Sequence, residues 1–325
     1  MEKRYLTLLI ALLAAATTFA QNINWVERNG QLKVLNGKVV NSRNVPPQLR
    51  GISMSWSIWQ GRKYYNPKVV SWLRSDFNIS LLRVSMAVQP DSGYLQQPEE
   101  QEKLVVKTID AAIANGLYVL IDWHDHHADQ HLAQSKVFFA KMAKRYAGKP
   151  NVMYEVFNEP EKIAWQTVKD YATQVIAAIR KYDVTNLIIV GSPTWDQDID
   201  IAAKDPIKGY QNIAYAFHFY ASDPNHQELL MKKADKALAL GLPLMVTEWG
   251  VGEANGNGEF NLEKTNKWLA WMEGHQLSWA NWNITDKKET TAILQPGASK
   301  SGNWKTTALT PAGQYIRTQL RQLNH

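Results

Sequence analysis

Eight short runs of apolar, often β-branched residues recur along the chain, and segments with helical periodicity separate them. The runs occupy residues 49–53, 79–86, 117–124, 151–158, 186–191, 213–220, 243–248 and 277–282. Near-continuous apolar character is typical of strands in a parallel sheet, because both faces of such a sheet are buried. Units of one strand and one helix that repeat roughly every 30 residues predict an α/β fold, the (β/α)8 or TIM barrel.

The segments between the runs carry the signals of crossover helices. Residues 98–116 open with a proline and two acids and close with glycine, and residues 164–182 place apolar side chains on one face. A doubly wound open sheet is the alternative, but no glycine-rich phosphate-binding turn follows an early strand. Residues 21–47 predict a short hairpin that covers the bottom of the barrel. We therefore expect one domain over residues 21–325.

The first 20 residues have the pattern of a secretory signal peptide. Lys3 and Arg4 precede an apolar run, and small residues lead up to Ala20, after which we expect cleavage. This predicts a secreted or periplasmic protein with no membrane contact after cleavage, an uncleaved anchor being the alternative. The absence of cysteine excludes disulfides and thiolate metal sites. The net charge of +6 is spread over several helices, which favours a solvated surface over a nucleic-acid partner.

Two glutamates stand out because each ends an apolar run. Glu159 lies in VMYEVFNEP and Glu248 lies in VTEWG. Glutamate is rarely buried without a partner, so an acid at such a place is held by hydrogen bonds or has a chemical function. If the two carboxyl groups face each other across a sugar bond, they can serve as the acid/base and the nucleophile of a glycoside hydrolase.

Further polar and aromatic residues fall near the ends of the predicted strands, where the active site of a barrel lies. They are Arg83, His124, Asn158, His218, Tyr220 and Trp282. Core packing explains any one of them, but it does not explain why all share this position. The 13 tryptophans and 13 tyrosines also exceed the needs of an ordinary core. Flat aromatic faces stack on pyranose rings, which favours a carbohydrate ligand.

Four strings, VMYEVFNEP, AFHFYA, VTEWG and SWANWNITDKKETTAILQPGA, carry a resemblance to a known family. From about Gln48 to Arg317 the chain resembles glycoside hydrolase family 5, most closely its bacterial endo-β-1,4-glucanases. The resemblance implies a retaining hydrolase that cuts internal bonds of cellulose and related β-glucans through a covalent glycosyl-enzyme. It implies Glu159 as acid/base, Glu248 as nucleophile, and neither a metal ion nor another cofactor.

Chemistry requires different surroundings for the two acids. Glu159 has to hold a proton near neutral pH, so we expect poor solvation and the neighbouring negative charge to raise its pKa. Glu248 has to stay ionised, which donors such as Arg83 and Tyr220 can achieve. The resemblance further implies that Asn158 donates to the sugar 2-hydroxyl.

The family pattern also assigns positions around the cleavage point. His124 and His218 would orient the substrate and the carboxylates. Trp282 would form the floor under the sugar, with a cis peptide bond to Asn283.

Other positions match substrate contacts farther from the cleavage point. Trp59 and Trp195 match family positions that stack sugars on the glycone and aglycone sides, respectively. Lys287 and Glu289 match polar contacts on the glycone side.

The chain departs from the family pattern at two glycone-side positions, Ser55 and Asp286, where many relatives have histidine. These departures bear on fine specificity rather than on the reaction.

Three alternatives stay open. The first keeps fold and mechanism but acts on mannan, xyloglucan or mixed-linkage glucan. The second is a metal-dependent barrel hydrolase that binds an ion through His124 and His126. The third is a sugar-binding barrel without catalysis, which the presence of both glutamates disfavours. We expect a monomer whose partner is a β-1,4-glucan polysaccharide or oligosaccharide bound in an open groove.

Overall fold

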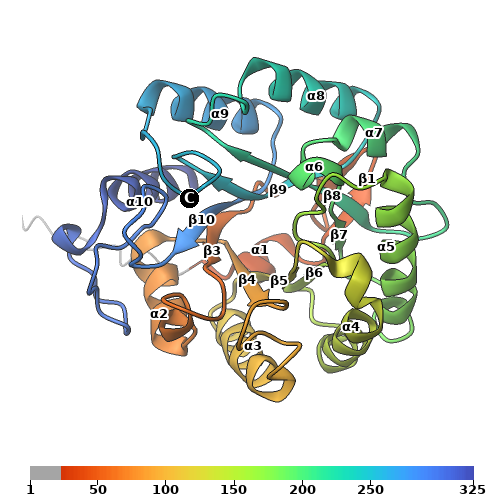
Figure 1. Ribbon diagram of the computed structural model, residues 1–325, viewed down its shortest axis with the longest axis horizontal. Coiled ribbons are helices and arrows are strands. Elements are labelled where there is room, and N and C mark those ends of the chain that lie inside the picture. Colours follow the sequence, from red (N-terminus) through yellow and green to blue (C-terminus); the bar gives the residue numbers. More distant parts are fainter. Residues whose placement is uncertain (1–22) are drawn as a thin grey trace, which may run out of the picture.

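The computed structural model describes residues 23–325, and its centre is a closed barrel of eight parallel strands (Figure 1). The predicted signal peptide, residues 1–20, lies outside the described residues. The barrel strands, in chain order, are β3 (Arg50–Met54), β4 (Leu81–Ala87), β5 (Tyr118–His124), β6 (Val152–Glu155), β7 (Ile188–Val190), β8 (Ile213–Tyr220), β9 (Leu244–Gly250) and β10 (Trp279–Ile284). Each strand pairs with its neighbours in the chain, and β10 pairs with β3 to close the ring. The predicted (β/α)8 fold is confirmed.

Helices surround the barrel (Figure 1). They are α2 (Pro67–Trp72), α3 (Pro98–Ala114), α4 (Leu132–Tyr146), α5 (Trp165–Arg180), α6 (Pro193–Asp196), α7 (Ile199–Lys204), α8 (Glu228–Ala239), α9 (Leu262–Gly274) and α10 (Pro311–Leu323). The apolar faces of the longer helices pack against the outside of the sheet; in α5, for example, Val168, Val175 and Ile179 are all fully buried. The short α6 instead lies in the loop after β7 and contains residues with non-helical backbone angles. The helical pattern of residues 98–116 and 164–182 therefore marks α3 and α5.

A small unit covers the amino-terminal ends of the strands. It consists of α1 (Trp25–Asn29) and an antiparallel hairpin of β1 (Lys33–Leu35) and β2 (Lys38–Val40). The Val34 N–H donates to Asn212 Oδ1, just before β8, at 3.0 Å. Near the other end of the chain, Asn324 Nδ2 donates to the main-chain oxygen of Arg50, the first residue of β3. The hairpin expected within residues 21–47 is present at the bottom of the barrel, and α1 was not expected.

Strand bounds differ from the apolar runs mainly in the fourth run. The run continues to Asn158, but β6 ends at Glu155. Val156 and Phe157 are fully buried even though they lie beyond the strand. Burial therefore continues past the end of the strand, which is why hydrophobicity alone placed that end too late. Within residues 23–325, no helix is long and apolar enough to cross a membrane.

Candidate active site

Arg83 organises the polar interior at the carboxyl ends of the strands. It is the third residue of β4 rather than its last, so the expectation that it lies at a strand end is wrong. Its long side chain is fully buried and rises toward the cleft from within the barrel. Nε donates to Glu155 Oε2 at 2.6 Å, and Nη1 donates to Glu248 Oε2 at 2.7 Å. Nη2 donates to Asn158 Oδ1 at 2.6 Å and lies 2.9 Å from Asp122 Oδ2.

Glu248, the fifth residue of β9, accepts hydrogen bonds on both carboxylate oxygens. Arg83 binds Oε2, and the Tyr220 hydroxyl donates to Oε1 at 2.6 Å. These are the two neighbours that the sequence analysis named for this acid. Donors on both oxygens fix the orientation of the carboxylate.

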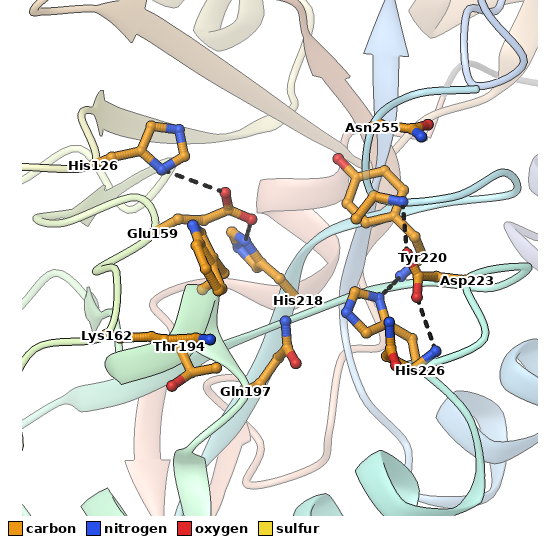
Figure 2. A pocket seen from close by; sticks show the side chains of 13 residues that line it. His126, Glu159, Lys162, Thr194, Gln197, His218, Tyr220, Asp223, His226 and Asn255 are labelled. Atoms are coloured by element: carbon orange, nitrogen blue, oxygen red, sulfur yellow. Dashed lines mark hydrogen bonds and ion pairs between the residues drawn. The ribbon is translucent and has the colours of Figure 1, made fainter. Parts of the chain in front are cut away.

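Glu159 follows β6 and faces two histidines (Figure 2). Its Oε1 lies 2.9 Å from His218 Nδ1, and its Oε2 lies 3.7 Å from His126 Nδ1. Burial alone would raise the pKa of Glu159, but the hydrogen bond and charge of His218, with smaller contributions from His126 and His124, outweigh burial and lower it. The expected rise of this pKa is therefore wrong for this structure, because the sequence did not reveal the strength of the His218 contact.

His218 lies in a buried pocket of acids. Its Nε2 is 2.8 Å from Thr247 Oγ1, 3.4 Å from Asp196 Oδ2 and 3.6 Å from Glu155 Oε1. Burial lowers the pKa of His218, but the charge of Asp196 and the nearby carboxylates of Glu155 and Glu159 raise it well above its ordinary value. These contacts favour the protonated form of His218, and its Nδ1 lies within hydrogen-bond distance of Glu159 Oε1.

The sequence reasoning missed three of these acids: Asp122, Glu155 and Asp196. Glu155 and Asp122 do carry a usable signal, since each is an acid inside an otherwise apolar run. All three are fully buried. Asp196 had no such signal, because it lies in a loop-like stretch with several other acids.

His124 does not take part in a group of candidate metal ligands. Its Nδ1 lies 2.7 Å from Asp122 Oδ2, and burial together with the charge of Arg83 lowers its pKa to about 3. Among residues 23–325, neither His124 nor His126 belongs to a set of three potential ligands whose donor atoms lie within 4.8 Å of one another. The residues of the proposed histidine metal site therefore do not fit a metal ion in this structure.

The two glutamates that the sequence singled out lie close together. One oxygen of Glu159 and one of Glu248 lie within 4.8 Å of each other. Carboxyl groups about 5–5.5 Å apart are typical of retaining glycosidases, whereas inverting enzymes need roughly 6.5–9.5 Å to admit a water molecule. The arrangement is therefore suited to a reaction in which one carboxylate attacks a carbon atom directly. The other carboxyl group would protonate the group that leaves this carbon.

A cleft runs across the carboxyl ends of the strands and has two halves that meet at Glu159 and Tyr220. The first half has a volume of about 710 Å³ and is lined by residues that include Lys162, Trp195 and His226 (Figure 2). The second half has a volume of about 350 Å³. Its lining includes Ser55, Trp56, Trp59, His124, Glu248, Trp282, Lys287 and Glu289. A linear ligand can thus extend to both sides of the carboxylates.

The family model described as Cellulase (glycosyl hydrolase family 5) matches residues 39–288. The chain belongs to this family. A solved structure from Cytophaga hutchinsonii is 43% identical, with a TM-score of 0.90, and the match covers 92% of this chain and 97% of that one. The catalytic domain of Thermobifida fusca endoglucanase Cel5A is 32% identical, with a TM-score of 0.87 and coverage of 91% and 99%.

Curated relatives are longer than this family 5 chain. Endoglucanase Z of Dickeya dadantii is 40% identical over 287 residues, which are 87% of this chain and 65% of that relative. Endoglucanase N of Pectobacterium atrosepticum is 40% identical over 91% of this chain and 66% of its own length. The chain thus spans about two thirds of the length of these two relatives.

Aromatic rings of this family 5 chain line the second half of the cleft. Trp282 stacks on His124 with 5.1 Å between the ring centroids and an interplanar angle of 10°. The peptide bond between Trp282 and Asn283 is cis, as expected. Trp56, which the sequence analysis did not name, lies edge-on to His124 at 4.2 Å and 5.6 Å from Trp59. Trp59 itself is 63% exposed, so its face is free to contact a ligand.

The remaining predicted residues flank the two halves. Lys287 Nζ lies 2.6 Å from Glu289 Oε2 beside the second half. Trp195 lies in the first half, with Lys162 Nζ 5.7 Å from its ring centroid. Of the two departures from the family pattern, Ser55 lines the cleft. Asp286 instead accepts hydrogen bonds from Lys63 Nζ at 2.7 Å and from a loop N–H at 2.9 Å, so its role here is to join loops.

Proposed function

We propose that this family 5 chain is a retaining endo-β-1,4-glucanase that hydrolyses internal bonds of cellulose and related β-glucans. The observation that carries the proposal is the pair Glu159 and Glu248, with carboxylate oxygens within 4.8 Å of each other in the middle of a two-sided cleft. The spacing supports a double displacement. The cleft on both sides of the pair supports attack within a chain rather than at its end.

In the first step, Glu248 attacks the anomeric carbon while Glu159 gives its proton to the glycosidic oxygen. The carbon–oxygen bond to the leaving sugar breaks, and an ester bond to Glu248 forms. Arg83 and Tyr220 hold the attacking carboxylate in place by hydrogen bonds to its two oxygens. His218 Nδ1, 2.9 Å from Glu159 Oε1, supplies the proton that Glu159 needs before this step.

In the second step, Glu159 takes a proton from water as the water oxygen attacks the anomeric carbon. The ester bond breaks, and Glu248 leaves as a carboxylate. Asn158 supports both steps, because Arg83 fixes its Oδ1 while its buried Nδ2 has no hydrogen-bond partner among the described residues. That amide is therefore available to donate to the sugar 2-hydroxyl, a bond that strengthens in the transition state.

Sugars on either side are assigned to the aromatic residues of the two halves. Trp282 forms the floor at the cleavage point, Trp59 stacks the glycone side, and Trp195 stacks the aglycone side. Lys287 and Glu289 contact hydroxyl groups on the glycone side. Each stacked ring contributes both apolar contact area and orientation.

The substrate class rests on the relatives. Several are named endoglucanases, and a variant of the Thermobifida fusca Cel5A domain has been solved with cellotetraose. We extend this substrate class to the present chain, with mixed-linkage β-glucan as a second substrate and mannan as the competing one. We also propose that the protein is exported through its amino-terminal signal and that it acts as a monomer.

The test compares wild type with Glu159→Gln and Glu248→Gln, using reducing-sugar release from carboxymethyl cellulose and from mannan. We expect cellulose activity that survives a chelator and falls by several orders of magnitude in both variants. Glu161→Gln is the matched control, since Glu161 does not line the cleft, and it should retain activity. Preference for mannan would overturn the substrate, and active glutamine variants would overturn the site.

Azide rescue separates the two roles. With an activated aryl cellobioside, Glu159→Ala still forms the glycosyl-enzyme because the leaving group needs no proton. Azide then replaces water and gives the β-glycosyl azide. In Glu248→Ala, azide attacks in place of the missing carboxylate and gives the α-glycosyl azide. The opposite pairing of products would reverse the assignment.

A further inference from the structure

Three consecutive residues other than glycine adopt left-handed backbone conformations beside the cleft. They are Thr194, Trp195 and Asp196, with φ angles of 59°, 54° and 61°. For such residues this conformation costs about 1 kcal/mol or more each. The surrounding structure must therefore hold this turn, defined as residues 194–196, and a turn held at such a cost is expected near a functional site.

The turn is tied to the segment that directly follows Glu159. The Trp195 N–H donates to Pro160 O at 2.8 Å, and the Thr194 N–H donates to Glu161 O at 3.0 Å. As a result, neighbouring side chains of the turn point to different places. Trp195 lines the first half of the cleft, whereas Asp196 is fully buried beneath it.

Asp196 has one satisfied and one unsatisfied oxygen. Its Oδ1 accepts from the Ser192 N–H at 2.5 Å. Its Oδ2 has no hydrogen-bond partner among residues 23–325 and lies 3.4 Å from His218 Nε2. On the other side of the same imidazole, Nδ1 lies 2.9 Å from Glu159 Oε1. Asp196 and Glu159 thus face opposite nitrogens of the His218 imidazole.

Charged and titratable groups reach these side chains from several elements. Those that act on His218 are Asp122 of β5, Glu155 of β6, Glu159, Asp196 of α6 and Glu248 of β9. Those that act on Glu159 besides His218 are His124 and His126, and Glu159 in turn acts on Tyr220 and His226.

Asp196 differs from the other acids in this set. Arg83 donates to Glu155 and Glu248 at 2.6 and 2.7 Å and lies 2.9 Å from Asp122, so each of these three acids has an arginine cation beside it. Asp196 lacks such an arginine contact within the described residues, and its charge is stabilised by His218 and by the Ser192 N–H. Burial raises the pKa of Asp196 well above its ordinary value, as it does the pKa of Asp122, and the charge of His218 is the main opposing effect on Asp196.

We propose that Asp196 is a positioning residue for the reaction, because its charge decides whether His218 or Glu159 holds the proton that they share. This inference rests on the proposed role of Glu159 as acid/base. When Asp196 is ionised, it stabilises the imidazolium, and the proton stays on His218 Nδ1. When Asp196 is neutral or absent, the proton moves along the hydrogen bond to Glu159 Oε1, where it can serve the glycosidic oxygen.

The consequence is that the alkaline loss of activity belongs to a coupled group of three residues. As pH rises, a proton leaves Asp196 for solvent, and the remaining proton shifts from Glu159 to His218. The apparent pKa on the alkaline side of the kcat/KM profile then describes Asp196, His218 and Glu159 together.

The test is Asp196→Asn, with the pH profile of kcat/KM as the readout. Asparagine keeps an oxygen for the Ser192 N–H and tolerates the left-handed conformation, so the turn is preserved. We expect the alkaline limb to move up by about one pH unit, with KM little changed. About one unit above the wild-type midpoint, wild type keeps roughly a tenth of its activity, and the variant should be several-fold more active.

Asp198→Asn is the matched control. Asp198 Oδ2 accepts from the Thr194 hydroxyl at 2.7 Å, so this variant also perturbs the turn, but Asp198 does not contact His218. Its alkaline limb should remain at the wild-type position. A shift of equal size in both variants would mean that loosening the turn, rather than the charge of Asp196, moves the limb, and that would overturn the proposal.

A second readout is independent of catalysis. Nitrogen-15 NMR of the His218 ring, assigned with His218→Gln, should show an imidazolium that persists to higher pH in wild type than in Asp196→Asn. Identical His218 titrations in a folded variant would contradict the inference. If Glu159→Gln proves fully active, the proposed function fails, yet the NMR comparison still reports on the Asp196 and His218 pair. The two failures are thus distinguishable.

Discussion

Arg83 links Glu248 to Asn158 through a single guanidinium group. Nη1 lies 2.7 Å from Glu248 Oε2, and Nη2 lies 2.6 Å from Asn158 Oδ1. The group is planar and fully buried, so the distance between the carboxylate and the amide is fixed by covalent geometry. In the proposed mechanism, one residue would therefore set both the angle of attack on the anomeric carbon and the position of the donor to the 2-hydroxyl.

Replacing Arg83 by lysine should impair both activity and stability. A lysine ammonium cannot span Glu248, Asn158 and Glu155 at once, so we expect kcat/KM to fall by about 100-fold or more. Loss of a partner in a buried ion pair typically costs about 3–5 kcal/mol, which should lower the melting temperature markedly. Initial rates and calorimetry measure the two effects.

Arg74→Lys is the control for this change. Arg74 is also buried, but it binds Asn78 and a main-chain oxygen away from the cleft. It should lose stability while its kcat/KM stays near the wild-type value. An Arg83→Lys variant with normal kcat/KM would contradict the organising role of Arg83.

Replacing Tyr220 by phenylalanine should lower kcat without unfolding the barrel. The change removes the hydroxyl that donates to Glu248 Oε1 at 2.6 Å. A hydrogen bond to a charged group contributes about 1.5–3 kcal/mol, which corresponds to a loss of roughly tenfold to 100-fold. Tyr215→Phe is the matched control on the same strand, because Tyr215 accepts from the Ile207 N–H outside the cleft. Equal kcat values for the two variants would argue against a role for the Tyr220 hydroxyl.

Trp59 and Trp195 should have opposite effects on where a chain is cut. Each change to alanine removes one stacking surface, worth about 1–3 kcal/mol by analogy with other ring stacking. We expect cello-oligosaccharides labelled at the reducing end to shift register toward the intact half of the cleft. Trp59 is 63% exposed, so Trp59→Ala should barely change stability. Identical product patterns in both variants would refute the assignment of the two halves.

His124 should make the fold sensitive to mild acid. Burial and the charge of Arg83 lower its pKa from 6.5 to about 3, so below pH 6.5 the unfolded chain binds a proton that the folded chain does not. This contribution to stability is present above pH 6.5 and is lost as pH falls toward 3. Between about pH 8 and about pH 5, the loss amounts to about 2 kcal/mol.

Urea denaturation at both pH values checks this prediction. His124→Asn should be less stable overall, but its free energy of unfolding should fall less between the two pH values, by about 2 kcal/mol. If wild type and variant lose the same free energy of unfolding between the two pH values, His124 titrates normally in the folded state.

The barrel was predictable because each strand leaves a repeated mark in the sequence. A strand buried on both faces needs several adjacent apolar residues, and eight such runs leave few other folds. The same logic failed at β6, where Val156 and Phe157 are buried without being part of the strand. Burial and strand pairing are separate properties, and the apolar runs of a sequence predict only burial.

The sequence singled out residues that the structure brings together, but it did not reveal the electrostatics around them. Glu159 and Glu248 are marked by their local strings, whereas the acids around His218 come from distant elements. The direction in which the pKa of Glu159 shifts depends on its close contacts with residues far away in the sequence, such as His218. Sequence patterns give neither these distances nor the balance between burial and charge.

The anchoring of Asn324 to Arg50 at the bottom of the barrel has a practical consequence. Residue 25 lies at the same face, where its N–H donates to Gly116 O just before β5. Both ends of the described chain are therefore on the side of the barrel away from the cleft. An enzyme immobilised on a bead or fused to another protein through either end would keep its cleft turned outward, and a long polymer could settle on it without meeting the support.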